Sequence, residues 1–205
     1  MVAIDNERLV KVFDKQADKW DRRRRKQTLD SKWRRQLLAG ARGQVLEIAV
    51  GAGGNFAYYD RSVHVTALDF SPLMVEKAKG AAKENRIEAD FFVGDIAAAD
   101  FPEGAYDTVV STLSMCAYSD PVWVLEQMNR WCREDGQILL LEHGKSAFTP
   151  LAWLQNLVDP LQVRMVGCHA NRDIEGILNA SPLKVERHER HFFGMVDMVW
   201  ARSSR

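Results

Sequence analysis

Residues 45–56 read VLEIAVGAGGNF, and the interpretation of the whole chain starts from this stretch. Val45 to Val50 form a short apolar run with one acid in it, which is the length of a buried parallel strand. Three glycines follow within four positions, and the chain after them favours a helix. A strand that passes through a glycine turn into a helix is typical of nucleotide binding. Glycine lets the backbone approach a ligand closely, and free N–H groups face that ligand.

The glycine spacing excludes two common nucleotide-binding motifs. The dinucleotide fingerprint G-x-G-x-x-G would need a glycine where this chain has Phe56, and no Gly-Lys-Ser/Thr of a Walker loop follows. A second expected strand, residues 63–69, ends in Asp69. An acid at that position accepts hydrogen bonds from ribose hydroxyls in nucleotide-binding α/β folds. Ser71 and Pro72 then suit the N-cap and the first position of a helix.

Two motifs resemble those of class I S-adenosylmethionine (SAM) methyltransferases. Glu47 to Gly53 resembles the first motif, acid-x-Gly-x-Gly-x-Gly, with Ala49 in place of the first glycine. Asp69 to Met74, reading Asp-x-Ser-Pro-x-Met, is similar to the second motif of the ubiquinone/menaquinone C-methyltransferase type. The resemblance covers residues 40–145 by motif. It implies the α/β class I methyltransferase (Rossmann-like) fold, a mostly parallel seven-stranded sheet with one antiparallel strand and helices on both faces.

The resemblance also implies SAM as the cofactor, bound at successive strand ends. Asp95 matches the family's acid after the third strand, which contacts the adenine amino group. The residues expected to bind the cofactor are Glu47, Ala49, Gly51, Gly53, Asn55, Asp69, Phe70, Ser71, Met74, Asp95, Ile96, Ser111 and Leu113.

The rest of the chain is expected to alternate between helices and strands within a single domain, residues 1–205. Residues 1–39 are expected to form a helical lid over a SAM-binding core, residues 40–205. Further helices are expected over 72–83, 121–132, 151–158 and 171–179, and further strands over 89–93, 108–113, 138–141, 183–190 and 195–201. The helix that starts at Leu151 is expected to end at Asp159-Pro160, and residues 134–137 are expected to form a turn.

Composition limits the partners. Formal net charge is zero, so nucleic acid is not expected. The three cysteines are widely spaced with no C-x-x-C pair, so neither a disulfide framework nor a metal site is expected. The N-terminus is polar and no apolar run is long enough to span a bilayer, so we expect a cytoplasmic monomer. The basic run Arg22 to Lys26 is either a solvated helix face or a contact with a membrane surface.

Methyl transfer from SAM sets requirements for the expected acceptor pocket. The reaction is an in-line displacement at an electrophilic methyl group, so the protein aligns the acceptor and excludes water. A thiol or amine acceptor must lose a proton, and a base assists. His143 directly follows the fifth expected strand and is the expected catalytic base, with a structural histidine as the open alternative. The expected pocket residues are Trp20, Met115, Cys116, Tyr118, Trp153 and His169, a lining with few fixed charges.

Several functions remain open. Segments near residues 111–116, 141–143, 153–155 and 167–168 look closest to a branch that holds thiol S-methyltransferase-like and quinone-methyltransferase-type proteins. That resemblance implies a small apolar or amphiphilic acceptor, with a thiol as first choice. C-methylation of a quinone precursor and N-methylation of a lipid amine are the alternatives. A non-catalytic SAM-binding regulatory or assembly protein is the alternative from another class. An NAD-dependent enzyme is disfavoured by the glycine spacing.

Overall fold

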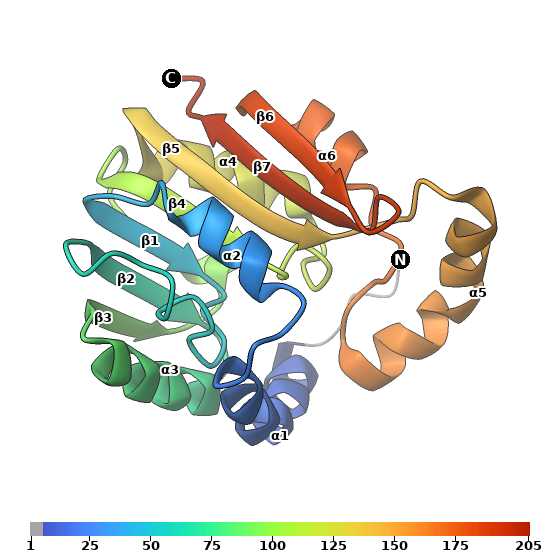
Figure 1. Cartoon of the computed structure of the whole chain (residues 1–205), viewed down its shortest axis with the longest axis horizontal. Helices are drawn as coiled ribbons and strands as arrows, with labels where there is room; N and C mark the ends of the chain where they lie inside the picture. Colours follow the sequence, from blue (N-terminus) through green and yellow to red (C-terminus); the bar gives the residue numbers. More distant parts are fainter. Residues whose placement is uncertain (1–5) are drawn as a thin grey trace.

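The computed structural model describes residues 6–205, which form a single seven-stranded sheet with helices on both faces (Figure 1). The strand order is β3-β2-β1-β4-β5-β7-β6. β7 runs antiparallel to both of its neighbours, and the other pairs are parallel. This confirms the predicted fold. The strands are β1 (Gln44–Ile48), β2 (His64–Asp69), β3 (Glu88–Val93), β4 (Tyr106–Thr112), β5 (Cys132–His143), β6 (Lys184–His191) and β7 (Val196–Arg202).

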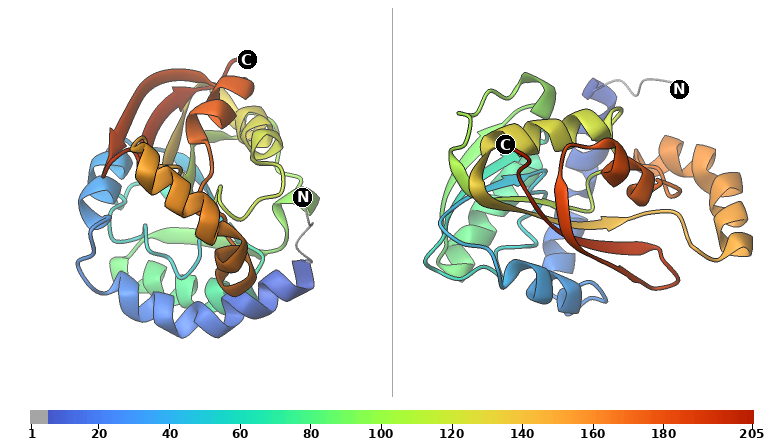
Figure 2. Two further views of the ribbon diagram at one scale, coloured as in Figure 1. Left: turned by 90° about the vertical axis from the view of Figure 1, so that its right-hand side faces the viewer. Right: turned by 90° about the horizontal axis from the view of Figure 1, so that it is seen from above.

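Apolar side chains fill both faces of the central strands, and neighbouring residues of one strand belong to different layers. Leu46 and Ile138 pack in one core with helices α4 and α6, whereas Val45 and Leu139 pack in the other with α2 and α3. Successive side chains of a strand point to opposite faces, so a run of apolar residues serves two layers at once. Figure 2 shows these layers on either side of the sheet.

The helices begin where the sequence offers caps. Ser71 accepts a hydrogen bond from the backbone N–H of Met74, and Asp120 accepts one from Trp123. In both helices a proline takes the first position, where its missing N–H costs nothing. The helices are α1 (Asn6–Arg24), α2 (Ser31–Leu38), α3 (Pro72–Asn85), α4 (Pro121–Trp131), α5 (Thr149–Val166), α6 (Ile174–Ala180) and the short 3₁₀ helix η1 (Ile96–Ala98).

The two N-terminal helices have different surroundings. In α2, Leu37 and Leu38 are buried in the core with β5 and β7. In α1, Ala17 packs against Met74 of α3, with Phe13 beside them. The division of the chain into a lid and a core at residue 39 stays a prediction. Within residues 6–205, no helix combines the length and the apolar character that a crossing of a bilayer would need.

The helix predicted directly after the glycines is absent. Residues 51–59 form a series of turns instead, in which the N–H of Gly53 bonds to the carbonyl of Val50, three residues back. Gly51 has φ +55° and Gly53 has φ +78°. An α-helix needs negative φ at every residue, so these two glycines cannot start one.

Two further boundaries differ from the sequence prediction. Pro160 lies inside α5 and does not end it, so the helix continues to Val166 and projects from the sheet (Figure 1). Proline removes one backbone hydrogen bond from a helix, and here the helix tolerates that loss. The predicted turn at residues 134–137 lies within the long strand β5. Pairing with β4 shifts there, from Tyr106 opposite Cys132 to Thr108 opposite Gln137.

Candidate active site

A cavity of about 500 Å³ opens at the carboxyl edge of the sheet, along the ends of β2, β1, β4 and β5. The order of the strands reverses between β1 and β4, and ligands of open α/β sheets bind at such a point. The volume lies within the usual range for a small-molecule site. Helix α1 borders the cavity through Phe13 and Trp20. The predicted site residues that line it are Trp20, Ala49, Gly51, Asp69, Phe70, Met74, Leu113, Cys116, Tyr118 and His143.

The glycine turn presents backbone to this cavity. No atom lies within 4 Å of the place where a Cβ on Gly51 would be, so the space above this residue is open. Ala49 has φ +52° and Leu113 has φ +57°. Residues other than glycine rarely adopt this left-handed backbone conformation, and such backbone strain is concentrated at functional sites. Ala49 thus takes a conformation that suits glycine, at the position where the methyltransferase motif has one.

Asp69 holds the turn from the neighbouring strand. Its Oδ2 accepts the N–H of Gly51 at 2.8 Å, and its Oδ1 accepts the N–H of Ser71 at 2.9 Å. Burial raises the pKa of Asp69 to about 6, although hydrogen bonds from the backbone of Ser71 and Gly51 act in the opposite direction. A carboxylate offers about four acceptor sites, so Asp69 can still accept donors from a ligand.

Glu47 and Asn55 lie behind the turn and outside the cavity lining. Glu47 is 1% exposed and accepts hydrogen bonds from Asn55 Nδ2 at 2.9 Å and from the Tyr59 hydroxyl at 2.8 Å. Arg34 of α2 donates to Asn55 Oδ1 and to Thr112 Oγ1. Burial raises the pKa of Glu47 to about 7, although the bond from Tyr59 and the charge of Arg34 lower it. These residues brace the turn, and we correct their expected direct contact with the cofactor accordingly.

Gly53, which was predicted to bind the cofactor, has a packing role in the structure. A Cβ at Gly53 would lie 2.7 Å from the Cβ of Ala81 and 2.7 Å from Phe56. The absence of a side chain therefore lets the turn pack closely on α3. Ser71 does not line the cavity either, because its hydroxyl caps α3 and bonds to Asp14 of α1.

Six other predicted residues lie away from the cavity lining. Asp95 caps η1 by accepting the N–H of Ala97, and the next residue, Ile96, is buried in the core. Ser111 bonds to buried Glu142, and Met115 is 1% exposed in the same core as Ile96. Alternation along a strand or turn aims the side chains of Ile96, Ser111 and Met115 inward, which position in the sequence alone did not show. The last two, both predicted for the acceptor pocket, are Trp153 and His169.

Trp153 lies on the outer side of α5 and is 66% exposed, because this helix projects from the sheet. His169 borders a second hollow near α4 and α6, and its Nδ1 lies 2.8 Å from Asp159 Oδ2. Its backbone N–H donates to the carbonyl of Cys116 at 3.0 Å. His169 therefore holds a loop in place and does not face the acceptor.

The residue before it, Cys168, does line the cavity, and sequence reasoning missed it. Cys116 after β4, His143 at the end of β5 and Cys168 after α5 bring two sulfurs and a ring nitrogen within 4.8 Å of one another. Two of the three cysteines, although widely spaced in the sequence, thus meet in the fold. One strand and two helices lie between them in the chain, so spacing offered no signal of the contact.

Hydrogen bonds set the protonation of this cluster. A bond from the Cys116 thiol, and then one from His143, lowers the pKa of Cys168 well below its usual value. Burial lowers the pKa of His143, but a hydrogen bond and attraction to Cys168 outweigh burial and raise it. Cys168 and His143 thus stabilise each other's charged forms.

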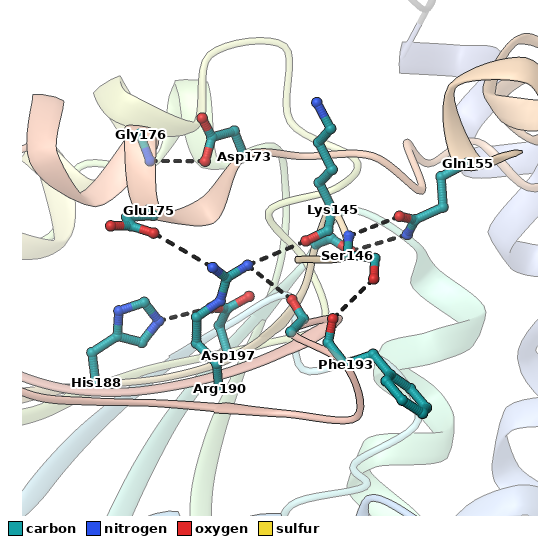
Figure 3. Close-up of polar contacts among 12 residues, drawn as sticks. Lys145, Ser146, Gln155, Asp173, Glu175, Gly176, His188, Arg190, Phe193 and Asp197 are labelled. Carbon is teal, nitrogen blue, oxygen red and sulfur yellow. Dashed lines mark hydrogen bonds and ion pairs between the residues drawn. The ribbon is translucent and has the colours of Figure 1, made fainter. Parts of the chain in front are cut away.

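A polar network holds the segment that follows His143, where Gln155 of α5 bonds to Ser146 and Arg190 of β6 bonds to Lys145 (Figure 3). The side-chain amide of Gln155, on α5, donates to the carbonyl of Gly144 at 3.1 Å and to that of Ala170 at 2.8 Å. Arg190 of β6 donates to the carbonyl of Lys145 at 3.2 Å. The same side chain of α5 thus holds Gly144, which follows His143, and Ala170, which lies two residues after Cys168.

The basic run at the end of α1 contributes to the cavity rim. Arg23, Arg24 and Lys26 line the cavity, together with Arg34 of α2. Arg24 is paired with Glu84 of α3 at 2.7 Å. The expectation of a lining with few fixed charges is therefore wrong, since four cations face the same space as the apolar side chains.

Comparisons with known proteins agree with this geometry. A family model described as a methyltransferase domain matches residues 45–136. Phosphatidylethanolamine N-methyltransferase of Cereibacter sphaeroides is 30% identical over 145 residues, 70% of this chain and 71% of that protein. A mitochondrial methyltransferase of Saccharomyces cerevisiae is 28% identical over 193 residues, 83% of this chain and 40% of that protein. A human thiol S-methyltransferase is 31% identical over 131 residues, 60% of this chain and 53% of that protein.

The chain thus spans between two fifths and about half of the yeast and human relatives. Geranyl diphosphate C-methyltransferase of Streptomyces coelicolor has the same fold, with a TM-score of 0.68 at 13% identity. The match covers 85% of this chain and 79% of that one. The chain belongs to the class I SAM-dependent methyltransferases, and its cofactor is SAM.

Proposed function

We propose that this protein transfers the methyl group of SAM to the sulfur of a small amphiphilic thiol. The observation that carries the proposal is the continuity of one cavity. It runs from Gly51 and Asp69, at the ends of β1 and β2, to Cys116 and His143, at the ends of β4 and β5, and Cys168, after α5. Cofactor and acceptor can therefore lie in the same space, as an in-line displacement requires.

The residues at the first end of the cavity fit SAM. The open space over Gly51 would be filled by any side chain, and a ligand can meet the backbone there. Asp69 lines the same space and retains acceptor capacity for ribose hydroxyls. Bound SAM supplies an electrophilic methyl group, and the chain supplies the alignment, the exclusion of water and a place for the acceptor's proton.

The lining supports an amphiphilic acceptor. Trp20, Leu113 and Phe192 offer apolar surface, and the rim carries the cations Arg23 and Lys26. Apolar surface favours an alkyl or aromatic body, and the cations favour an anionic end group. The relation to a human thiol S-methyltransferase supports sulfur as the accepting atom.

His143 is the side chain that we propose acts on the acceptor's proton. It lies at the carboxyl end of β5 and lines the cavity beside Cys116. A thiol attacks as the thiolate, so a group that removes its proton or stabilises its anion speeds the transfer.

A panel of acceptors tests this proposal. We expect methylated product with alkyl and aryl thiols, and faster turnover for a thiol with a terminal carboxylate than for its uncharged analogue. Faster methylation of phosphatidylethanolamine in micelles would instead favour a lipid amine, the substrate named for the Cereibacter relative. Methylation of a demethylated quinol would favour a ring carbon. SAM binding without any product would favour a regulatory or assembly protein.

Contact with a membrane surface is also proposed, at a place other than the predicted run Arg22 to Lys26. Four side chains at a spacing of four residues lie on the outer face of α5, and each is more than 60% exposed: Trp153, Leu157, Leu161 and Met165. Phe192, in the turn between β6 and β7, is 56% exposed and also lines the cavity. An exposed apolar helix face of this kind suits insertion at a bilayer interface. An amphiphilic acceptor dissolved in the bilayer would then have a short path to the cavity.

A further inference from the structure

The cluster of Cys116, His143 and Cys168 supplies three soft ligand atoms to one corner of the cavity. The two sulfurs and one ring nitrogen lie within 4.8 Å of one another. Tetrahedral zinc has Zn–S bonds of about 2.3 Å and Zn–N bonds of about 2.0–2.1 Å, which puts its ligand atoms roughly 3.3–3.8 Å apart. A contraction of about 1 Å, within reach of side-chain rotation, would close the cluster around an ion.

We propose that Cys116, His143 and Cys168 bind one Zn²⁺ ion and leave its fourth position open to the acceptor cavity. Two thiolates and one imidazole are a ligand set that suits zinc, and carboxylates, which would favour magnesium or calcium, do not take part. The nearby acid Glu142 is turned inward, where it accepts hydrogen bonds from Ser111 and from the backbone N–H of Ser114. Structural zinc sites have four protein ligands, whereas three protein ligands with one open position are typical of catalytic sites.

Hydrogen bonds around the cluster hold the segments that carry the two cysteines, and such contacts orient the ligands of metal sites. Glu142 also accepts the N–H of Met115 at 3.1 Å and so holds the turn that carries Cys116. Asp159 accepts the N–H of Ala170 at 2.8 Å and holds the loop that carries Cys168. Gln162 of α5 directs its amide toward the sulfur of Cys168 at 3.8 Å.

The helix end before Cys168 is fixed by packing. Gly167 ends α5 with φ +81°, and a Cβ there would lie 2.8 Å from Leu9 of α1. Only glycine allows the chain to turn at this point while α5 and α1 stay in contact. The position of Cys168 therefore depends on the packing of α1, the helix that also borders the acceptor cavity.

An open zinc position would give the cluster a task in the transfer, and this part of the inference rests on the proposed thiol acceptor. An ion held by Cys116, His143 and Cys168 would lower the pKa of a bound acceptor thiol, whose proton would go to solvent. A lone pair of that sulfur forms a bond to the methyl carbon of SAM. The bond between this carbon and the sulfonium breaks, and its electron pair stays on the sulfur of S-adenosylhomocysteine. The neutral thioether product would bind zinc weakly and leave. With the ion bound, His143 would act on the acceptor as a zinc ligand, in place of the direct action on its proton proposed above for the metal-free chain.

Metal titration of the reduced chain, residues 1–205, tests the site without reference to any acceptor. We expect one Zn²⁺ per chain in competition with a chromophoric chelator. Co²⁺ in its place should give the intense visible bands of a tetrahedral site and a thiolate-to-cobalt charge-transfer band. Cys116→Ala, Cys168→Ala and His143→Ala should each weaken binding by at least about 10²-fold, because changes even to outer-shell partners cost 10–100-fold.

Cys132→Ala is the matched control. Cys132 is buried at the start of β5, where its thiol bonds to the carbonyl of Gln137, and it lies outside the cavity. Its replacement should leave metal binding unchanged, and SAM affinity measured by calorimetry should show that every variant is folded.

The metal site and the proposed thiol acceptor can each be contradicted without the other. Equal zinc affinity in wild type, Cys116→Ala and Cys168→Ala would overturn the site, as would a folded, SAM-binding chain that takes up no zinc. If such a metal-free chain still methylates thiols, the proposed function stands and the site falls. If zinc binds at the three residues and no thiol is methylated, the site stands and the proposed acceptor falls.

Discussion

Backbone groups form one end of the cavity and side chains form the other. The cofactor end consists of backbone turns at the ends of β1 and β2, braced by buried polar side chains such as Glu47 and by Arg34 of α2. The acceptor end consists of side chains carried by β4, β5 and the loop after α5, a helix whose outer face is exposed. The comparison indicates that buried hydrogen bonds hold the turns of the cofactor end, whereas the acceptor end depends on how separate segments pack.

The largest expected effect is at the acceptor end. His143→Ala should lower turnover by roughly 10²–10⁴-fold, the usual contribution of a positioned proton-transfer group, and leave SAM affinity nearly unchanged. His64→Ala, on β2 and remote from the cavity, is the control. Steady-state kinetics and calorimetry on the same preparations check both parts. Wild-type turnover in His143→Ala would reduce the imidazole to a structural group.

At the cofactor end, buried Glu47 should make stability depend on pH. Its pKa is raised from 4.5 to about 7, so the protonated form stabilises the fold at low pH and this stabilisation is lost as pH rises through 7. The free energy of unfolding of wild type relative to Glu47→Gln should fall by about 3 kcal/mol between pH 4.5 and pH 7. Denaturant titrations of both proteins measure the difference. A difference that stays constant over this range would show that Glu47 is ionised in the fold.

The next prediction concerns cofactor affinity. Asp69→Ala should weaken SAM binding by about 1.5–3 kcal/mol, the scale of hydrogen bonds to a charged group. Because the pKa of Asp69 is raised to about 6, wild-type affinity should decline as pH falls below 6, and the variant should lose this dependence. Asp90→Ala, an exposed acid on β3, is the control. Unchanged affinity in a folded Asp69→Ala protein would contradict the assignment of this carboxylate to the cofactor.

A smaller effect is expected on the outer face of α5. Leu157→Glu with Leu161→Glu should lower partition onto phospholipid vesicles by at least about 10-fold, because burial of each leucine contributes about 1.5–3 kcal/mol. Methylation of a water-soluble thiol should stay at the wild-type rate. The same two changes with no effect in a vesicle flotation assay would exclude this face as the membrane contact.

The smallest expected effect tests the strain in the turn. Ala49→Gly should raise the free energy of unfolding by about 0.5–1 kcal/mol. Relief of the left-handed alanine is worth about 1–2 kcal/mol, and the greater freedom of unfolded glycine offsets part of it. Thermal unfolding without ligand measures the change. Destabilisation by Ala49→Gly would show that the turn holds alanine without strain.

The sequence was informative where function depends on contiguous residues. The strand, the glycine turn and Asp69 could be predicted because backbone conformation and close approach select residue types locally. Arg34 and Cys168 could not, since α2 and the loop after α5 reach the cavity only through tertiary packing. The extent of α5 was missed because Pro160 predicts an end that the helix does not have. Trp153 was assigned to the pocket wrongly, because the sequence shows which residues share a face of the helix but not what that face packs against.

Transfer of a labelled methyl group from SAM to an alkyl thiol tests the central claim most directly. Wild type and Cys132→Ala should yield labelled thioether and S-adenosylhomocysteine in equal amounts. Cys168→Ala and His143→Ala should bind SAM with wild-type affinity and yield little thioether. Equal yields of labelled thioether from all four proteins, or label transferred only to an amine or a ring carbon, would contradict the proposed transfer to sulfur at this cluster.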